Sequence, residues 1–70
     1  MNTRELFTQS NNYIWEPNEE ITIVNLTGGK FLLKPGLQMK AYDEIFGIKF
    51  STILDMKVDI INSGYYIRLI

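Results

Sequence analysis

The chain contains no cysteine and no histidine among its 70 residues. Without cysteine, neither a disulfide nor a thiolate metal site can stabilise so small a fold. Without either residue type, the sequence lacks the commonest general base, the commonest metal ligand and the best nucleophile. We therefore predict a protein that is not an enzyme and that uses no cofactor and no metal.

A charge excess of one sign is also missing, because seven Lys and Arg residues balance eight Asp and Glu residues. Such a chain exerts no strong long-range attraction on nucleic acid or anionic lipid. Residues 1–10 lack the apolar run of about 7–15 residues that marks a secretory signal. No apolar stretch approaches the roughly 20 residues that span a bilayer. The sequence predicts a cytoplasmic protein that has no membrane partner.

Apolar residues are abundant, since hydrophobic residues make up 46% of the chain and ten of them are isoleucine. This composition predicts a folded chain rather than a disordered one. We expect one small β-rich domain over residues 1–70. A chain of this length buries only about 60% of the surface that it exposes when unfolded, so its stability should be marginal. The many Asn, Ile and Lys residues are typical of AT-rich genomes, including those of phages.

The N-terminal residues carry a helix signal. Asn2 and Glu5 have the spacing of a capping box, in which each side chain accepts a hydrogen bond from the backbone of the other. We expect a short helix of about two turns here, followed by an extended segment over residues 13–15. That segment should end before Pro17, because the residue that precedes a proline avoids the helical region.

Two glycine-containing turns divide the next part of the chain into predicted strands. β-Branched and apolar residues over 21–27 predict a strand. Gly28 and Gly29 favour a two-residue hairpin turn into a strand over 31–33. Pro35 and Gly36 favour a type II turn into a third strand over 37–42.

The C-terminal half alternates between apolar and polar residues. One parity carries Ile48, Phe50, Thr52, Leu54, Met56, Val58 and Ile60. This period of two predicts a half-buried antiparallel strand over residues 48–60, or two strands in line with a kink near Ser51, with only Ile53 on the wrong face. A helix over the same residues would place Lys57 on its apolar face, so we favour the strand. A turn at 62–64 and a last strand over 65–70 complete the prediction.

These elements predict a mainly β fold of four to six strands with a short N-terminal helix. The strands could form a small antiparallel meander or an SH3- or OB-like barrel, because alternation does not encode strand order. The segment Gly28-Gly29-Lys30 resembles part of a phosphate-binding loop. It lacks the first glycine and the Ser or Thr of that motif, and a strand follows it where a helix is required, so we interpret it as a turn.

Paired carboxylates are the remaining route to catalysis or cation binding. Asp43 and Glu44 are neighbours, and neighbours on a strand point to opposite faces. Asp55 and Asp59 share a face with Lys57 between them. We interpret these acidic residues as a solvated strand face rather than as a catalytic pair.

The chain has more large apolar side chains than a thin core on one side of a sheet can bury. We name as candidate protein-contact residues Trp15, Phe46, Ile53, Tyr65 and Tyr66. Trp and Tyr are enriched where binding energy is concentrated in interfaces. We therefore predict a protein-binding module, either a small inhibitor or adaptor of a larger protein or a subunit of a homo-oligomer. These side chains could also simply complete a monomeric core.

Single-stranded nucleic acid is the alternative partner. The candidate residues are the basic and aromatic ones around the glycine-containing turns: Lys30, Phe31, Lys34, Lys40 and Tyr42. Aromatic side chains beside lysines on a sheet hold stacked bases in many proteins. Neutralising about three phosphates contributes little salt-dependent affinity, so we rank this function below protein binding.

Overall fold

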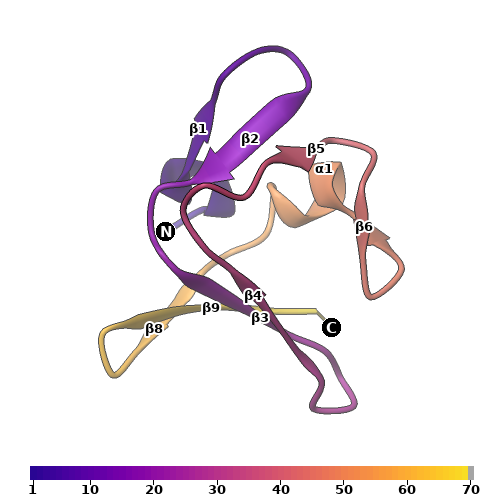
Figure 1. Ribbon diagram of the computed structural model, residues 1–70. Coiled ribbons are helices and arrows are strands. Elements are labelled where there is room, and N and C mark those ends of the chain that lie inside the picture. Colours follow the sequence, from indigo (N-terminus) through magenta and orange to yellow (C-terminus); the bar gives the residue numbers. More distant parts are fainter. Residues whose placement is uncertain (70) are drawn as a thin grey trace.

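The computed structural model describes residues 1–69 and shows a mainly β protein, as predicted (Figure 1). Within these residues there are nine strands, one short 3-10 turn and one short α-helical turn. Their bounds are η1 Thr3–Leu6, β1 Phe7–Gln9, β2 Ile14–Pro17, β3 Ile21–Val24, β4 Lys30–Leu33, β5 Met39–Lys40, β6 Glu44–Ile45, β7 Ile48–Lys49, α1 Phe50–Ile53, β8 Asp59–Ile61 and β9 Gly64–Arg68.

The strands form three sheets in the described part of the chain. Their orders are β1-β2-β5, β4-β3-β9-β8 and β6-β7. All neighbouring strands are antiparallel except β3 and β9, which pair in parallel. The predicted meander is therefore wrong, because β4 and β5 follow each other in the chain but lie in different sheets. The three separate sheets do not support a specific SH3- or OB-like barrel either.

The capping box is confirmed at the N-terminus. The Asn2 side chain accepts from the Arg4 N–H at 3.0 Å, and the Glu5 carboxylate accepts from the Asn2 N–H at 2.7 Å. The helix that follows is shorter than the predicted two turns, since it is a single 3-10 turn. It ends at Leu6 because Phe7 takes up extended geometry and enters the core as the first residue of β1.

The Pro35-Gly36 turn is confirmed, but the two-residue turn at Gly28 and Gly29 is wrong, and the strand predicted over 37–42 is only Met39–Lys40. The Leu37 N–H donates to the Lys34 carbonyl at 3.1 Å and Gly36 has a φ of 96°, as a type II turn requires. The loop between β3 and β4 spans residues 25–29, so it is longer than the predicted two-residue turn and β3 ends before Asn25. The last turn joins β8 to β9, and Ile70 of the predicted final strand lies outside the described residues.

The single strand predicted over residues 48–60 is wrong, and the alternative of two strands in line is correct only in that the strand is interrupted near Ser51, where a helical turn takes the place of a kink. The chain forms β7, then α1, then an irregular stretch, and only later β8. Phe50, Ile53 and Leu54 are all buried, which one helical turn achieves and a strand cannot. The off-parity position of Ile53 was the sequence signal for this turn.

The core is one cluster that draws on all three sheets, on η1 and on α1. Phe7 of β1 and Phe50 of α1 form its aromatic centre, with ring centroids 5.1 Å apart in an edge-to-face arrangement. The four-stranded sheet contributes Ile21, Ile23, Leu33 and Ile67, all fully buried. The alternate residues of the same strands point away from this core.

Candidate interaction surface

The four-stranded sheet has one face that is covered at its centre and one open face. At the edges of the covered face, Phe31 and Ile60 remain 41% and 60% exposed. The open face, called the outer face below, consists of Thr22, Val24, Lys30, Leu32, Asp59, Ile61, Tyr66 and Arg68. None of these residues is buried. Their strand neighbours of the other parity include the fully buried core residues of β3, β4 and β9. Because successive strand residues alternate between faces, this burial pattern identifies the outer face as uncovered.

The outer face is more apolar than a solvated sheet face normally is. A solvated face of a sheet is expected to carry mostly polar residues. Here a row across the sheet places Leu32 beside Thr22 and Thr22 beside Tyr66. Leu32 of β4 is 44% exposed and Ile61 of β8 is 42% exposed, at opposite edges of the sheet. Large side chains therefore extend over the full width of this face, with Tyr66 on an inner strand.

Charged residues lie among these apolar ones. Arg68 Nε donates to Asp59 Oδ2 at 3.0 Å, and both side chains are about half exposed. An exposed pair of this kind contributes about 0–1 kcal/mol to stability. Its main effect is to neutralise both charges at the β8 side of the face. A hollow of ≈ 370 Å³ lies at this pair, lined by Asp59 and Arg68 together with Met56 and Lys57.

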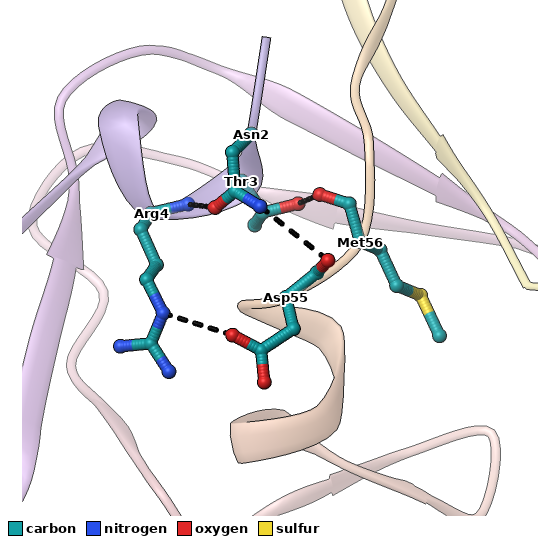
Figure 2. A network of polar contacts seen from close by, with 5 residues as sticks. All are labelled: Asn2, Thr3, Arg4, Asp55 and Met56. Atoms are coloured by element: carbon teal, nitrogen blue, oxygen red, sulfur yellow. Dashed lines mark hydrogen bonds and ion pairs between the residues drawn. The ribbon is translucent and has the colours of Figure 1, made fainter.

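The N-terminal residues pair with the segment that leads into β8, and Figure 2 shows Asn2, Thr3 and Arg4 against Asp55 and Met56 of that segment. Thr3 donates twice to the Met56 carbonyl, from its N–H at 3.0 Å and from Oγ1 at 2.8 Å. Asn2 forms an antiparallel bridge with Lys57. The Val58 N–H donates to the Met1 carbonyl at 2.8 Å. The first residues of the chain thus pair with the segment that leads into β8.

Arg4 strengthens this pairing. Its Nε donates to Asp55 Oδ1 at 3.0 Å, and the Asn2 side chain donates to the Asp55 carbonyl at 3.4 Å (Figure 2). The Arg4 guanidinium carbon also lies 5.6 Å from the centroid of the Trp15 ring. Arg4 therefore connects β2 to the segment after α1.

Of the predicted protein-contact residues, Tyr66 lies on the outer face. Tyr65 has the opposite parity, is half-buried and packs against the core. Ile53 is fully buried in α1, so its prediction as a contact residue is corrected: it is a core residue. The structure does not bring these three side chains together on one surface.

Trp15 and Phe46 have separate positions. Trp15 is half-buried against the core, and its indole N–H is buried without an acceptor in the described residues. Phe46 is 41% exposed in the turn between β6 and β7, with a φ of 52° that bulky residues rarely adopt. A Cβ atom on Gly29 would come within 3.3 Å of the Phe46 ring. This ring therefore packs on the loop between β3 and β4.

The predicted nucleic-acid residues are divided between two sheets. Lys30 and Phe31 lie on β4 and point to opposite faces, while Lys40 lies on β5 of the three-stranded sheet. Lys34 follows β4 directly, and Tyr42 is 63% exposed in the turn after β5. The five residues therefore do not form a single basic and aromatic surface.

The acidic residues considered for catalysis hold local structure together. The Asp43 carboxylate accepts from the Lys40 N–H at 2.9 Å. Asp55 and Asp59 each pair with an arginine at 3.0 Å. In residues 1–69, no group of three or more Asp and Glu side chains is placed to hold a metal ion.

Several residues of the outer face were missed by the sequence analysis: Val24, Leu32 and Arg68. The last strand did hold a signal, because Tyr66 and Arg68 alternate with Tyr65, Ile67 and Leu69. The same parity separates Thr22 and Val24 from the buried Ile21 and Ile23. What the sequence did not reveal is that these strands lie side by side.

Comparison of the chain with protein-family models, with curated protein sequences and with solved structures gives no significant match. The described residues contain no helix of the length and apolar character needed to cross a membrane. A functional proposal for this chain must therefore come from its geometry and its surface chemistry.

Proposed function

We propose that this chain is a non-enzymatic protein-binding module, acting as a small inhibitor or adaptor of a larger protein, and that the outer face is its contact surface. The observation that carries the proposal is the uncovered sheet face on which Val24, Leu32, Ile61 and Tyr66 are accessible. Apolar side chains that gather on one exposed face, rather than being scattered singly, mark interaction surfaces in many proteins.

The energetics favour a partner on this face. Complete burial of one large apolar side chain contributes roughly 1.5–3 kcal/mol. Leu32 and Ile61 are each somewhat under half exposed, so a partner would gain about half of that value from each. Tyr66 adds a side chain type that is enriched among the residues that dominate binding energy. A few such residues, surrounded by charged groups, form the usual arrangement of an interface.

Single-stranded nucleic acid is the competing partner for the same face. Tyr66 with Lys30 and Arg68 nearby could stack on a base and contact phosphates. Arg68 is already paired with Asp59, and the chain has a net charge of −1. The charge available for phosphates is therefore small, and a protein partner is favoured.

The test compares Tyr66→Ser with Tyr13→Ser. Tyr13 is 64% exposed in the loop between β1 and β2, away from the outer face, so its substitution is the matched control. Each variant and the parent chain would be immobilised and used to capture proteins from an extract of the source cells. Bound proteins would be identified by mass spectrometry, and circular dichroism would verify the fold of each variant.

We expect a specific protein to be retained by the parent chain and by Tyr13→Ser and to be lost with Tyr66→Ser. Equal retention by all three would remove the outer face as the contact surface. Light scattering on the purified chain detects the homo-oligomer instead. If the parent chain retains a single-stranded oligonucleotide and Tyr66→Ser does not, the outer face binds nucleic acid instead.

A further inference from the structure

The β4 strand is an open edge next to the outer face. It ends the strand order of the four-stranded sheet, and its only strand neighbour in the described residues is β3. Lys30, Phe31 and Leu32 are all exposed, which a covered strand would not show. An open edge presents unpaired N–H and C=O groups that can accept another strand.

The register identifies which backbone groups point outward. The Asn25 N–H donates to the Gly29 carbonyl at 2.8 Å, so this pair is hydrogen-bonded across the hairpin. Hydrogen-bonded and non-hydrogen-bonded pairs alternate in an antiparallel ladder. The Lys30 and Leu32 pairs are therefore the non-hydrogen-bonded ones, and their N–H and C=O groups point away from β3. Two residues with free donors and acceptors form a short docking edge.

The side chains at this edge have a definite chemistry. Lys30, Leu32 and Lys34 share one parity, and Lys30 and Leu32 belong to the outer face. The two lysines are four residues apart, which is about 13 Å along an extended chain. A strand that pairs with β4 would complement them with two acidic side chains and one apolar side chain between them.

A second copy of the chain is a poor occupant of the same edge. Antiparallel pairing of two β4 strands about Leu32 would set Lys30 of each copy opposite Lys34 of the other. Like charges directly opposite each other destabilise a strand pair, and lysine on an edge strand is a common means of preventing self-association. The same lysines attract a strand of opposite charge.

We infer that β4 receives an extended acidic segment of the partner protein, which joins the sheet as an additional antiparallel strand. This inference rests on the proposed function, because the added strand would belong to the protein that covers the outer face. Backbone hydrogen bonds at Lys30 and Leu32 would supply affinity, and the two lysines would select acidic side chains.

The test uses a capped peptide, acetyl-Ser-Glu-Val-Ile-Val-Glu-Ser-amide, and a control peptide in which lysine replaces both glutamates. Binding would be followed by amide NMR on the labelled chain, with hydrogen exchange measured in the bound state. We expect the acidic peptide to bind more tightly, to shift β4 signals and to slow exchange at Lys30 and Leu32. Binding should weaken as salt is raised, because both ion pairs are exposed.

Two sets of variants locate the contact. The double change Lys30→Glu with Lys34→Glu should weaken the acidic peptide by about tenfold and favour the lysine peptide, because two attractive pairs become repulsive. The matched control reverses two lysines away from this edge, Lys49→Glu with Lys57→Glu, and should leave both affinities nearly unchanged. Leu32→Pro removes one outward N–H and should weaken binding more than Leu32→Ala does.

The inference is overturned if the acidic peptide does not bind, if it shifts signals away from β4, or if both peptides bind equally. The proposed function fails separately, through retention of the captured protein by Tyr66→Ser. Loss of that protein with Tyr66→Ser, together with no peptide binding at β4, leaves the outer face as the contact surface and rejects strand addition. Peptide binding at β4 without an effect of Tyr66 rejects the outer face.

Discussion

The two edges of the four-stranded sheet are protected in different ways. At the β8 edge, the chain uses its own first residues, which pair with residues 56–58. At the β4 edge no part of residues 1–69 forms a further strand pair, and charged side chains lie at both ends of the strand. Pairing closes an edge to every strand, whereas positive charge excludes only strands of like charge. The β4 edge is therefore the place where we propose that an acidic partner strand is added.

The β8 edge retains little capacity for strand addition. Asn62 and Ser63 both have positive φ, of 51° and 66°, as expected for a two-residue hairpin turn of the type that fits strand twist. This turn makes the Ile61 and Gly64 pair hydrogen-bonded, so only Ile60 of β8 points its backbone outward. A single outward residue next to the Met1 to Val58 hydrogen bond offers a much shorter edge than β4 does.

The largest expected effect on stability distinguishes a proline substitution in the inner strand β3 from one in the edge strand β4. Thr22→Pro removes an N–H that faces β9 from the centre of the sheet, and we expect it to lower the free energy of unfolding by about 2–3 kcal/mol, because a ladder hydrogen bond is lost and its buried acceptor is left unpaired. Leu32→Pro in the same cross-strand row removes only an outward N–H, and we expect a loss of about 1 kcal/mol. Urea denaturation would measure both. Similar losses for the two variants would contradict an open β4 edge.

The next effect concerns the closed edge. Thr3→Val keeps the shape of a fully buried side chain but removes the hydroxyl that donates to the Met56 carbonyl. We expect the free energy of unfolding to fall by about 1–2 kcal/mol, because a buried hydrogen bond is lost. Thr52→Val, at an exposed position of α1, is the matched control and should change stability by less than about 0.5 kcal/mol. Equal effects would show that the Thr3 hydroxyl does not hold this edge.

A smaller effect is expected from the cap that orients the same residues. Asn2→Ala removes the side chain that accepts from the Arg4 N–H and donates to the Asp55 carbonyl. Loss of an N-cap lowers stability by about 1 kcal/mol. Thermal unfolding would detect this change, with Asn12→Ala in an exposed loop as the control. A variant as stable as the parent chain would show that this cap does not help to hold the N-terminal residues against the segment that leads into β8.

The last variant should have the smallest effect on stability but a clear effect on self-association. Lys30→Ile with Lys34→Ile removes the charges at the open edge, and we expect stability to change by no more than about 0.5 kcal/mol because both positions are on the surface. The variant should self-associate as its concentration rises, since the repulsion between two β4 strands is gone. Sedimentation would measure the association. A variant that stays monomeric would show that these lysines do not prevent self-association.

Local features of the fold could be predicted from the sequence because they depend on neighbouring residues. The capping box at Asn2 and the turn at Pro35 and Gly36 are determined by side chains within three residues of each other. The strand prediction for residues 48–60 failed because most residues of the helical turn that begins at Phe50 also match the apolar and polar alternation of a strand. Burial of residues that are distant in the sequence favours the helical turn, and the off-parity Ile53 was the one sign of it in the alternation.

The surface proposed for binding depends on contacts that are distant in the sequence. Thr22 and Tyr66 are neighbours only because β3 pairs in parallel with β9, more than forty residues later. The alternation determines which residues of each strand face the core, but it does not determine that these two strands are neighbours. The open β4 edge also depends on β5 joining β2 instead of β4. The sequence could therefore identify Tyr66 as an aromatic contact candidate, but it could not identify the apolar and charged residues around it.

The most direct test of this account is amide hydrogen exchange along β4 in the protein without any partner. An open edge with the present register predicts slow exchange at Phe31 and Leu33, whose N–H groups face β3, and fast exchange at Lys30 and Leu32. Uniform protection of all four amides would show that something already covers the edge, and the reverse alternation would show that the register is wrong. Either result would contradict an open, lysine-flanked strand beside the outer face.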